Sequence, residues 1–198
     1  LTTPYDTRLA ADADASPENQ LRPTPGANTG ASGAATLLEL ARTLNVEESG
    51  HTVCLAFFDA EQNGGLPGWE PNLGSQIFVR SQPLSVPRCA SPRLVVNVDT
   101  VGAIDQVFYQ DSLGDQALQD AIWQTATNLD YGRWFDRQQF PLPAGSHTAF
   151  QAQEVATATL TSADYPERNT MEDTLDLLNA ESFQHVGMTL ETWLETAP

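Results

Sequence analysis

The stretch HTVCLAFFDAEQNGG, residues 51–65, decides the fold. Its first part is a run of apolar, β-branched and aromatic side chains, which is too short for a core helix and is typical of a buried strand. The run ends in Asp59, Glu61 and Gln62, and a glycine pair follows where the chain turns. We therefore expect a strand over residues 51–60 that brings polar side chains to the edge of a sheet.

Helices and strands alternate along the rest of the chain. Further buried strands are expected over residues 93–102, 105–112 and 154–162. Helices are expected over residues 31–44, 74–79, 113–132 and 179–197, the last one capped by Asn179. The inner face of the first helix is expected at Leu37, Leu38, Ala41 and Leu44. This alternation favours an α/β protein, a three-layer α/β/α sandwich with a mixed, mostly parallel sheet.

Composition limits the classes of function. With 198 residues and 40% hydrophobic content, the chain is expected to form one domain over residues 1–198, in which residues 1–30 supply a strand remnant and a Gly-rich loop. The net charge is -17, and all nine basic residues are arginine. Such a chain repels phosphate backbones, and it has no apolar run of the roughly 18 residues that span a membrane, so we expect neither nucleic-acid binding nor membrane insertion. Cys54 and Cys89 fit either one disulfide or two buried thiols.

Six segments follow one another in a specific order. They are YDTR (residues 5–8), PGANTGASGAATLLELAR (25–42), FFDAEQNGGLPGWEPNLGSQIFV (57–79), VNVDTVG (96–102), GSHTAF (145–150) and YPERNTMEDTLDLLNAESFQHVG (165–187). Together they resemble the zinc exopeptidases of metallopeptidase clan MH, family 28, which include bacterial leucyl aminopeptidases and glutaminyl cyclases. The resemblance implies strands that precede residue 1. It also implies a secreted or cell-surface protein, because many members of the family are exported.

The resemblance implies two zinc ions bridged by an aspartate, each also held by a histidine and a further carboxylate, with a glutamate as the general base. The cyclases use one zinc with an Asp, a Glu and a His. In this chain the general base falls on Glu61 and one ligand falls on Asp99. The remaining ligands fall on residues that lack a metal-binding group: the first His on Pro4, the bridging Asp on Thr29, the acid beside the base on Gln62 and the last His on Asn169.

Since only Asp99 keeps a ligand position, we expect no zinc and no other cofactor. The sequence predicts a catalytically degenerate domain that serves as a binding or scaffold module for a peptide or protein ligand. Glu61 would be a vestigial general base in a polar pocket formed by Asp6, Thr29, Gln62, Asp99, His147 and Asn169. Trp69 and Trp134 are candidates for an apolar wall beside this pocket.

Other interpretations are open at this point. An active aminopeptidase or glutaminyl cyclase-like hydrolase could hold a harder metal, such as Mg²⁺ or Ca²⁺, through Glu61, Asp99, Asp59 and Asp164. Alternatively, these acids are solvent-facing strand ends. His147 fits a structural, hydrogen-bonding histidine, and His51 and His185 fit surface positions. Residues 170–173 fit a helix capping box.

Overall fold

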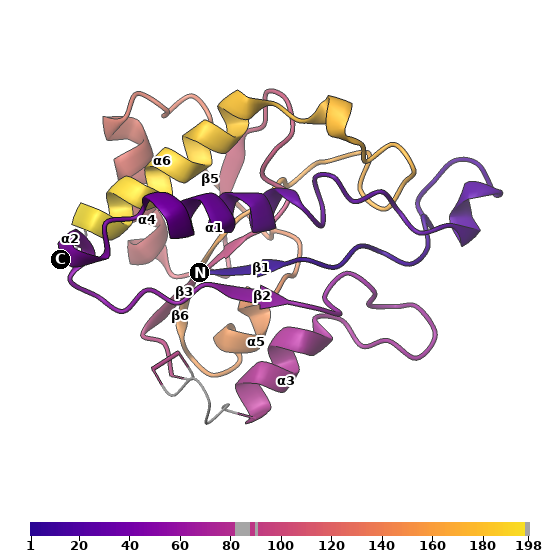
Figure 1. Ribbon diagram of the computed structural model, residues 1–198, viewed down its shortest axis with the longest axis horizontal. Coiled ribbons are helices and arrows are strands. Elements are labelled where there is room, and N and C mark those ends of the chain that lie inside the picture. The colour runs from indigo at the N-terminus through magenta and orange to yellow at the C-terminus, as the bar shows by residue number, and fades with distance from the viewer. Residues whose placement is uncertain (82–87, 90, 197–198) are drawn as a thin grey trace.

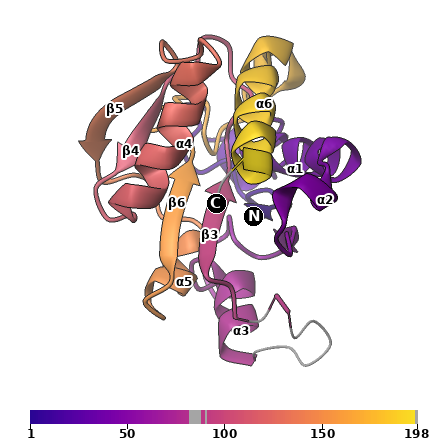
Figure 2. The same ribbon diagram turned by 90° about the vertical axis from the view of Figure 1, so that its left-hand side faces the viewer.

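The computed structural model describes residues 1–81, 88–89 and 91–196. Four parallel strands form the main sheet in the order β2-β1-β3-β6: β1 (Thr2–Pro4), β2 (Ala56–Phe58), β3 (Leu94–Val98) and β6 (Ala156–Leu160). A second parallel pair, β4 (Phe108–Asp111) and β5 (Phe135–Phe140), lies beside β6 (Figure 2). An isolated antiparallel bridge joins Phe108 of β4 to Ser162, just after β6. The predicted mixed, mostly parallel sheet is therefore confirmed.

Helices cover both faces of the sheet, as the three-layer prediction requires (Figures 1 and 2). One face carries α1 (Ser32–Thr43), α4 (Gln116–Asn128) and α6 (Ala180–Thr196), and the other carries α3 (Leu73–Ser81) and α5 (His147–Gln151). The short elements are α2 (Val46–Ser49), η1 (Asn19–Leu21) and η2 (Leu175–Leu177). Asn179 caps α6 as predicted, since its side chain accepts from the Glu181 amide at 2.9 Å, while position 197 lies outside the described residues.

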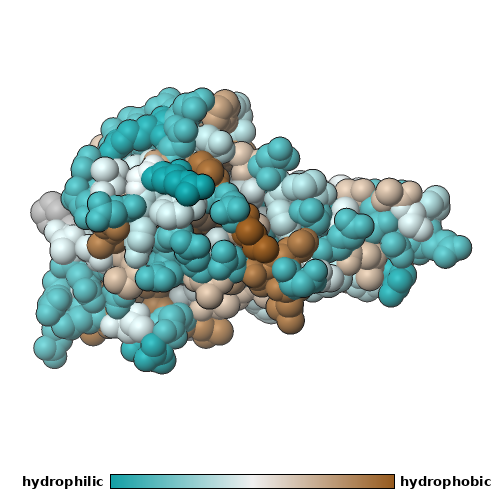
Figure 3. All heavy atoms as spheres, turned by 90° about the horizontal axis from the view of Figure 1, so that it is seen from above, coloured by the Kyte–Doolittle hydropathy of each residue, from teal (hydrophilic) through white to brown (hydrophobic). Residues whose placement is uncertain are grey.

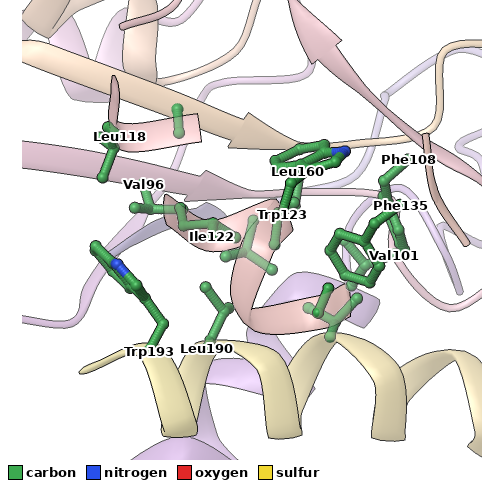
Figure 4. Close-up of a cluster of buried hydrophobic side chains, with 14 of the residues drawn as sticks. Val96, Val101, Phe108, Leu118, Ile122, Trp123, Phe135, Leu160, Leu190 and Trp193 are labelled. Carbon is green, nitrogen blue, oxygen red and sulfur yellow. The ribbon is translucent and has the colours of Figure 1, made fainter. Parts of the chain in front are cut away.

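The main hydrophobic core lies between the sheet and the helices α1, α4 and α6. Val96 and Leu160 of the sheet meet Trp123 of α4 and Leu190 of α6 in its centre (Figure 4). The Trp123 indole N–H donates to the Asp136 carbonyl at 2.7 Å, so this large side chain is buried without an unsatisfied donor. A smaller cluster on the other face contains Phe58, Val95 and Phe150.

The inner face of α1 differs from the prediction. Leu37 is buried, but Leu38 is 63% exposed and Ala41 also faces solvent, while Leu40 takes an inner position. Gly33 determines this rotation, because a Cβ there would lie 2.1 Å from the Val98 carbonyl oxygen. The side of the helix that carries Gly33 therefore faces the sheet. The spacing of the leucines alone does not identify that side.

The pairing of the strands corrects the predicted length of one strand. The strand expected over residues 51–60 is limited to β2, because β1 offers only three residues to pair with, and Phe57 at this edge is 36% exposed. The strand β5 and the helix α5 were not predicted. Cys54 and Cys89 form a disulfide, which settles the alternative between a bridge and two thiols. Among the described residues, no helix is both long enough and apolar enough to cross a membrane.

Most of the surface that covers α1 and α6 is hydrophilic, and hydrophobic residues lie there in separate small areas (Figure 3). This agrees with the net charge of -17, which is spread along the chain.

Candidate functional site

The polar residues predicted from the sequence gather where the parallel strands end. Asp6 follows β1, Glu61 and Gln62 follow β2, and Asp99 follows β3. Carboxyl ends of parallel strands lie at one edge of a sheet, so residues more than 90 positions apart meet there. The Gly-rich turn before α1 adds Thr29 to the same group.

Asp6 holds the turn that follows β2. Its carboxylate accepts from the Glu61 amide at 3.1 Å, the Gln62 amide at 3.0 Å and the Asn63 side-chain nitrogen at 3.1 Å. Burial raises the pKa of Asp6, while the two backbone hydrogen bonds from Gln62 and Glu61 oppose the rise. Asp6 therefore binds the turn after β2 through two backbone amides and the Asn63 side chain.

Glu61 is buried and bonded to the start of α3. One oxygen, Oε1, accepts from the Ser75 amide at 2.6 Å, and Oε2 lies 3.1 Å from the Ser75 hydroxyl. Burial is the main cause that raises the pKa of this carboxyl to about 7; the charges of Asp6 and Asp99 also raise it, and the hydrogen bonds with Ser75 oppose the rise. Gly74 permits the approach, because a Cβ there would lie 2.1 Å from the Asp59 carbonyl oxygen. Both Glu61 oxygens are thus occupied by the protein itself.

Gln62 connects the turn after β2 with the Gly-rich turn. Its side-chain nitrogen donates to the Thr29 carbonyl at 3.0 Å, and the Gln62 side chain lies near the Asp99 carboxyl. Burial raises the pKa of Asp99, and the charge of Arg168 together with hydrogen bonds from Thr100 and Gln62 lowers it in part. A neutral NH₂ group therefore donates to the Thr29 carbonyl beside the Asp99 carboxyl.

Asp173 is a central residue that the sequence interpretation missed. It is fully buried, and its carboxylate accepts from the Asn28 amide at 2.7 Å, the Thr29 hydroxyl at 2.6 Å and the Tyr165 hydroxyl at 3.0 Å. The capping box expected over residues 170–173 is wrong, because this acid holds the Gly-rich turn and caps no helix. The adjacent acids Glu172 and Asp173 could have indicated a functional residue, but the capping box offered a local explanation for them.

Asn169 and His147 lie apart from this hydrogen-bonded group. Asn169 has a left-handed φ of 60°, and its backbone carbonyl accepts from Ala13 at 3.2 Å. His147 is 2% exposed, with Nε2 3.9 Å from an Asp111 oxygen and Nδ1 unpartnered within the described residues. Burial lowers the pKa of His147 to about 4, so the ring is neutral at physiological pH. The structure thus buries this histidine without the hydrogen bonds expected of it.

The predictions for Trp134 and His185 also change. The Trp134 ring stacks on His185 of α6, with centroids 3.8 Å apart, and packs against the main core rather than beside the site. His185 is buried there, not on the surface as predicted, and Tyr131 covers it with its centroid at 4.5 Å. Trp69 is half-buried in the loop after Glu61, where its amide donates to the Leu66 carbonyl.

The residues do not fit zinc. The described part of the chain contains no group of three or more His, Cys, Asp or Glu side chains that could hold a metal ion. The set Glu61, Asp99, Asp59 and Asp164 is therefore not assembled, and Asp59 and Asp164 are exposed. A structural or catalytic zinc site needs three or four thiolate, imidazole or carboxylate ligands from the protein. The ligand positions instead hold an imino acid, a hydroxyl and two amides: Pro4, Thr29, Gln62 and Asn169.

Comparison with known proteins places the chain among zinc exopeptidases and glutaminyl cyclases. The sequence profile of Peptidase family M28 matches residues 5–194. The structure is similar to Tannerella forsythia glutaminyl cyclase, with a TM-score of 0.87 and 25% identity over 100% of this chain and 73% of that one. A leucine aminopeptidase precursor from Bacteroides thetaiotaomicron VPI-5482 gives a TM-score of 0.87 and 26% identity over 100% of this chain and 71% of that one.

A Zn-dependent exopeptidase from Parabacteroides distasonis ATCC 8503 shares the fold, with a TM-score of 0.87 and 21% identity over 99% of this chain and 72% of that one. No curated protein sequence gives a significant match. The chain thus spans between 71% and 73% of the length of these three solved relatives.

Proposed function

This chain belongs to peptidase family M28, and from that premise we propose that it is a catalytically degenerate member, a binding or scaffold module for a peptide or protein ligand. The observation that carries the proposal is the bonding of Gln62. Its amide donates to the Thr29 carbonyl at 3.0 Å and lies close enough to Asp99 to lower the pKa of that acid, so a neutral NH₂ group stands where a cation would interact with these oxygens. An amide nitrogen offers no lone pair to a metal.

The hydrogen bonds of the other acids support the same proposal. Asp6 accepts from three donors, and Glu61 accepts from Ser75 through one oxygen and lies within hydrogen-bonding distance of its hydroxyl through the other. A general base must have a lone pair directed at the water that it deprotonates. The strand ends of this chain are therefore stabilised as structure, and we expect the family's hydrolytic and cyclase reactions to be lost. No metal or other cofactor is part of the proposed role.

The proposal is tested by metal content and activity together. The purified protein is titrated with zinc, its bound metal is measured by elemental analysis, and activity is assayed on leucyl-p-nitroanilide and on a peptide with N-terminal glutamine. We expect well below one zinc ion per chain and no turnover on either substrate. One zinc per chain, or turnover that Glu61→Gln abolishes, would establish the alternative, an active metal-dependent aminopeptidase or glutaminyl cyclase-like enzyme.

A restored variant provides the positive control for this test. It combines Pro4→His, Thr29→Asp, Gln62→Glu and Asn169→His, and so returns the donor types that the family's site requires. We expect this variant to bind zinc more tightly than the natural chain by at least tenfold. If the restored variant and the natural chain bind zinc equally weakly, the assignment of these four positions to the metal site is wrong.

We also propose that the protein works in an oxidising compartment, as a secreted or cell-surface protein would. The disulfide between Cys54 and Cys89 supports this location, because such bonds are kept reduced in most cytosols. The test is alkylation of free thiols in the native host before lysis, followed by mass spectrometry. Protein carrying two alkyl groups would contradict the proposed location.

A further inference from the structure

A cavity near the strand-end site is lined by none of the residues of that site. It has a volume of about 340 Å³ and opens between the loop after β3 and the loop after β6. Its walls include two tyrosines and three acids, and no arginine lines it: Tyr109, Tyr165, Asp105, Asp164 and Glu167. We propose that this cavity, the tyrosine–acid pocket, binds the guanidinium side chain of an arginine in a peptide or protein ligand.

The pocket is built before any ligand arrives. Gln106 closes the loop after β3 with two hydrogen bonds, accepting from the Ala103 amide at 3.2 Å and donating to the Thr100 carbonyl at 2.6 Å. On the opposite wall, the Ser162 amide donates to the same Thr100 carbonyl at 3.2 Å. The Ile104 amide donates to the Leu177 carbonyl at 3.1 Å and fixes the third wall. A preformed cavity lowers the entropic cost of binding.

The two tyrosines offer ring surface and are held in place by their neighbours. The Tyr165 hydroxyl donates to Asp173 at 3.0 Å, so its ring orientation is tied to the carboxylate that holds the Gly-rich turn. Tyr109 packs edge-on against Phe140, with centroids 5.1 Å apart and planes at 89°. Fixed aromatic faces attract a planar guanidinium by stacking and by the cation–π interaction.

The carboxylates of the three pocket acids form none of the ion pairs of the described residues, whereas the acids of the strand-end site are bonded to the protein. Asp164 and Glu167 accept hydrogen bonds through their backbone carbonyls, from Ser162 and Thr170. Asp105 adopts a left-handed φ of 53°, a conformation that a loop residue keeps when the surrounding structure demands it. These carboxylates are available to a cationic ligand.

The spacing of the acids selects the kind of cation. The described residues contain no group of three or more acidic, His or Cys side chains close enough to hold a metal ion, so these acids do not converge on one point. They surround a cavity with the apolar side chains Ile104, Val107 and Leu177 on its walls. Separated acids and apolar walls together suit a large cation at the end of an apolar chain. The arginine side chain has this form, because its planar guanidinium carries five N–H donors on a chain of methylene groups.

The inference does not depend on whether the M28 site is inactive, because it concerns different residues. The probe is the capped tripeptide acetyl-Ala-Arg-Ala-amide, titrated into the isotopically labelled protein and followed by amide chemical shifts. We expect saturable shifts at residues 103–107 and 162–167. The matched peptide with citrulline, which has nearly the same shape but no charge, is expected to bind at least tenfold more weakly.

Two double variants separate the pocket from the general negative charge of the protein. Asp105→Asn with Asp164→Asn is expected to weaken binding of the arginine peptide about tenfold, the effect of losing two partly exposed ion pairs. The control, Glu47→Gln with Glu48→Gln, removes the same charge from α2, which packs near the far end of α6, and is expected to leave the affinity unchanged. Equal affinity for the citrulline peptide, no saturable shifts at the pocket, or equal weakening by both double variants would overturn the inference.

Discussion

Replacing Glu61 with glutamine tests whether this buried carboxyl carries a proton in the folded protein. The Ser75 amide donates to Glu61 Oε1 at 2.6 Å, and the Ser75 hydroxyl lies 3.1 Å from both Glu61 Oε2 and the Asn72 carbonyl. A hydroxyl has one proton to donate. If Ser75 gives it to Asn72, Glu61 must supply the proton between Oε2 and the hydroxyl, and the glutamine NH₂ group supplies such a proton at every pH.

The size of the effect follows from the pKa of Glu61. Burial raises it from the ordinary value of 4.5 to about 7. The folded state then binds the proton more tightly than the unfolded chain, so folding loses stability as the pH rises from about 4.5, and the loss is complete above about 7. The full loss is about 3 kcal/mol, of which about 1 kcal/mol is already present at pH 5.

Because glutamine does not ionise, Glu61→Gln is expected to raise the free energy of unfolding by about 1 kcal/mol at pH 5 and by about 3 kcal/mol at pH 8. The measurement is urea unfolding of both proteins at pH 5, 6, 7 and 8. The control Glu48→Gln, at an exposed position of α2, is expected to change stability by less than about 0.5 kcal/mol at each pH. A Glu61→Gln protein that is destabilised at pH 8, or whose gain does not grow with pH, would refute the reasoning.

The remaining predictions concern stability and are measured by urea unfolding at pH 7. Asp173→Asn leaves buried donors of the Gly-rich turn without their charged partner and is expected to cost about 2–4 kcal/mol; a cost below about 1 kcal/mol would contradict its central role. Gly33→Ala forces a Cβ into a strand carbonyl at 2.1 Å and is expected to destabilise by more than about 2 kcal/mol, whereas Gly187→Ala in α6 meets nothing within 4 Å and is expected to stabilise by up to about 1 kcal/mol. Replacing Cys54 and Cys89 together by serine opens a bridge across 35 positions and is expected to cost about 3–4 kcal/mol; an unchanged midpoint would show that the bridge does not constrain the unfolded chain.

The meeting of Asp6, Glu61 and Asp99 could be predicted from the sequence. Each follows a strand of the parallel sheet, and parallel strands end at one edge of their sheet, so the alternation of elements was sufficient to place them together. The family resemblance added Thr29 and the identity of the missing ligands. What these residues bond to could not be predicted, because Ser75 and Asn63 reach them through loops whose course depends on the assembled fold.

Features that depend on residues far apart in the chain could not be predicted from the sequence. Asp173 lies 144 positions from Thr29, and its neighbours offered a local capping explanation that needed no distant contact. His185 looked like a surface residue because Trp134, which buries it, comes from a different element. The inner face of α1 was misplaced since one glycine, rather than the leucine spacing, sets how the helix meets the sheet.

The carboxylate of Asp173 has a consequence for the speed of motion at this end of the molecule. Loops between elements ordinarily open easily and exchange their amide hydrogens with solvent at rates close to those of a free peptide. The amides of Asn28 and Thr29 donate instead to the buried Asp173. They can therefore exchange only when Tyr165 and the loop that carries Asp173 also move. We therefore expect the Gly-rich turn and the tyrosine–acid pocket to open together, so that a ligand held in the pocket slows hydrogen exchange in a turn that it does not touch.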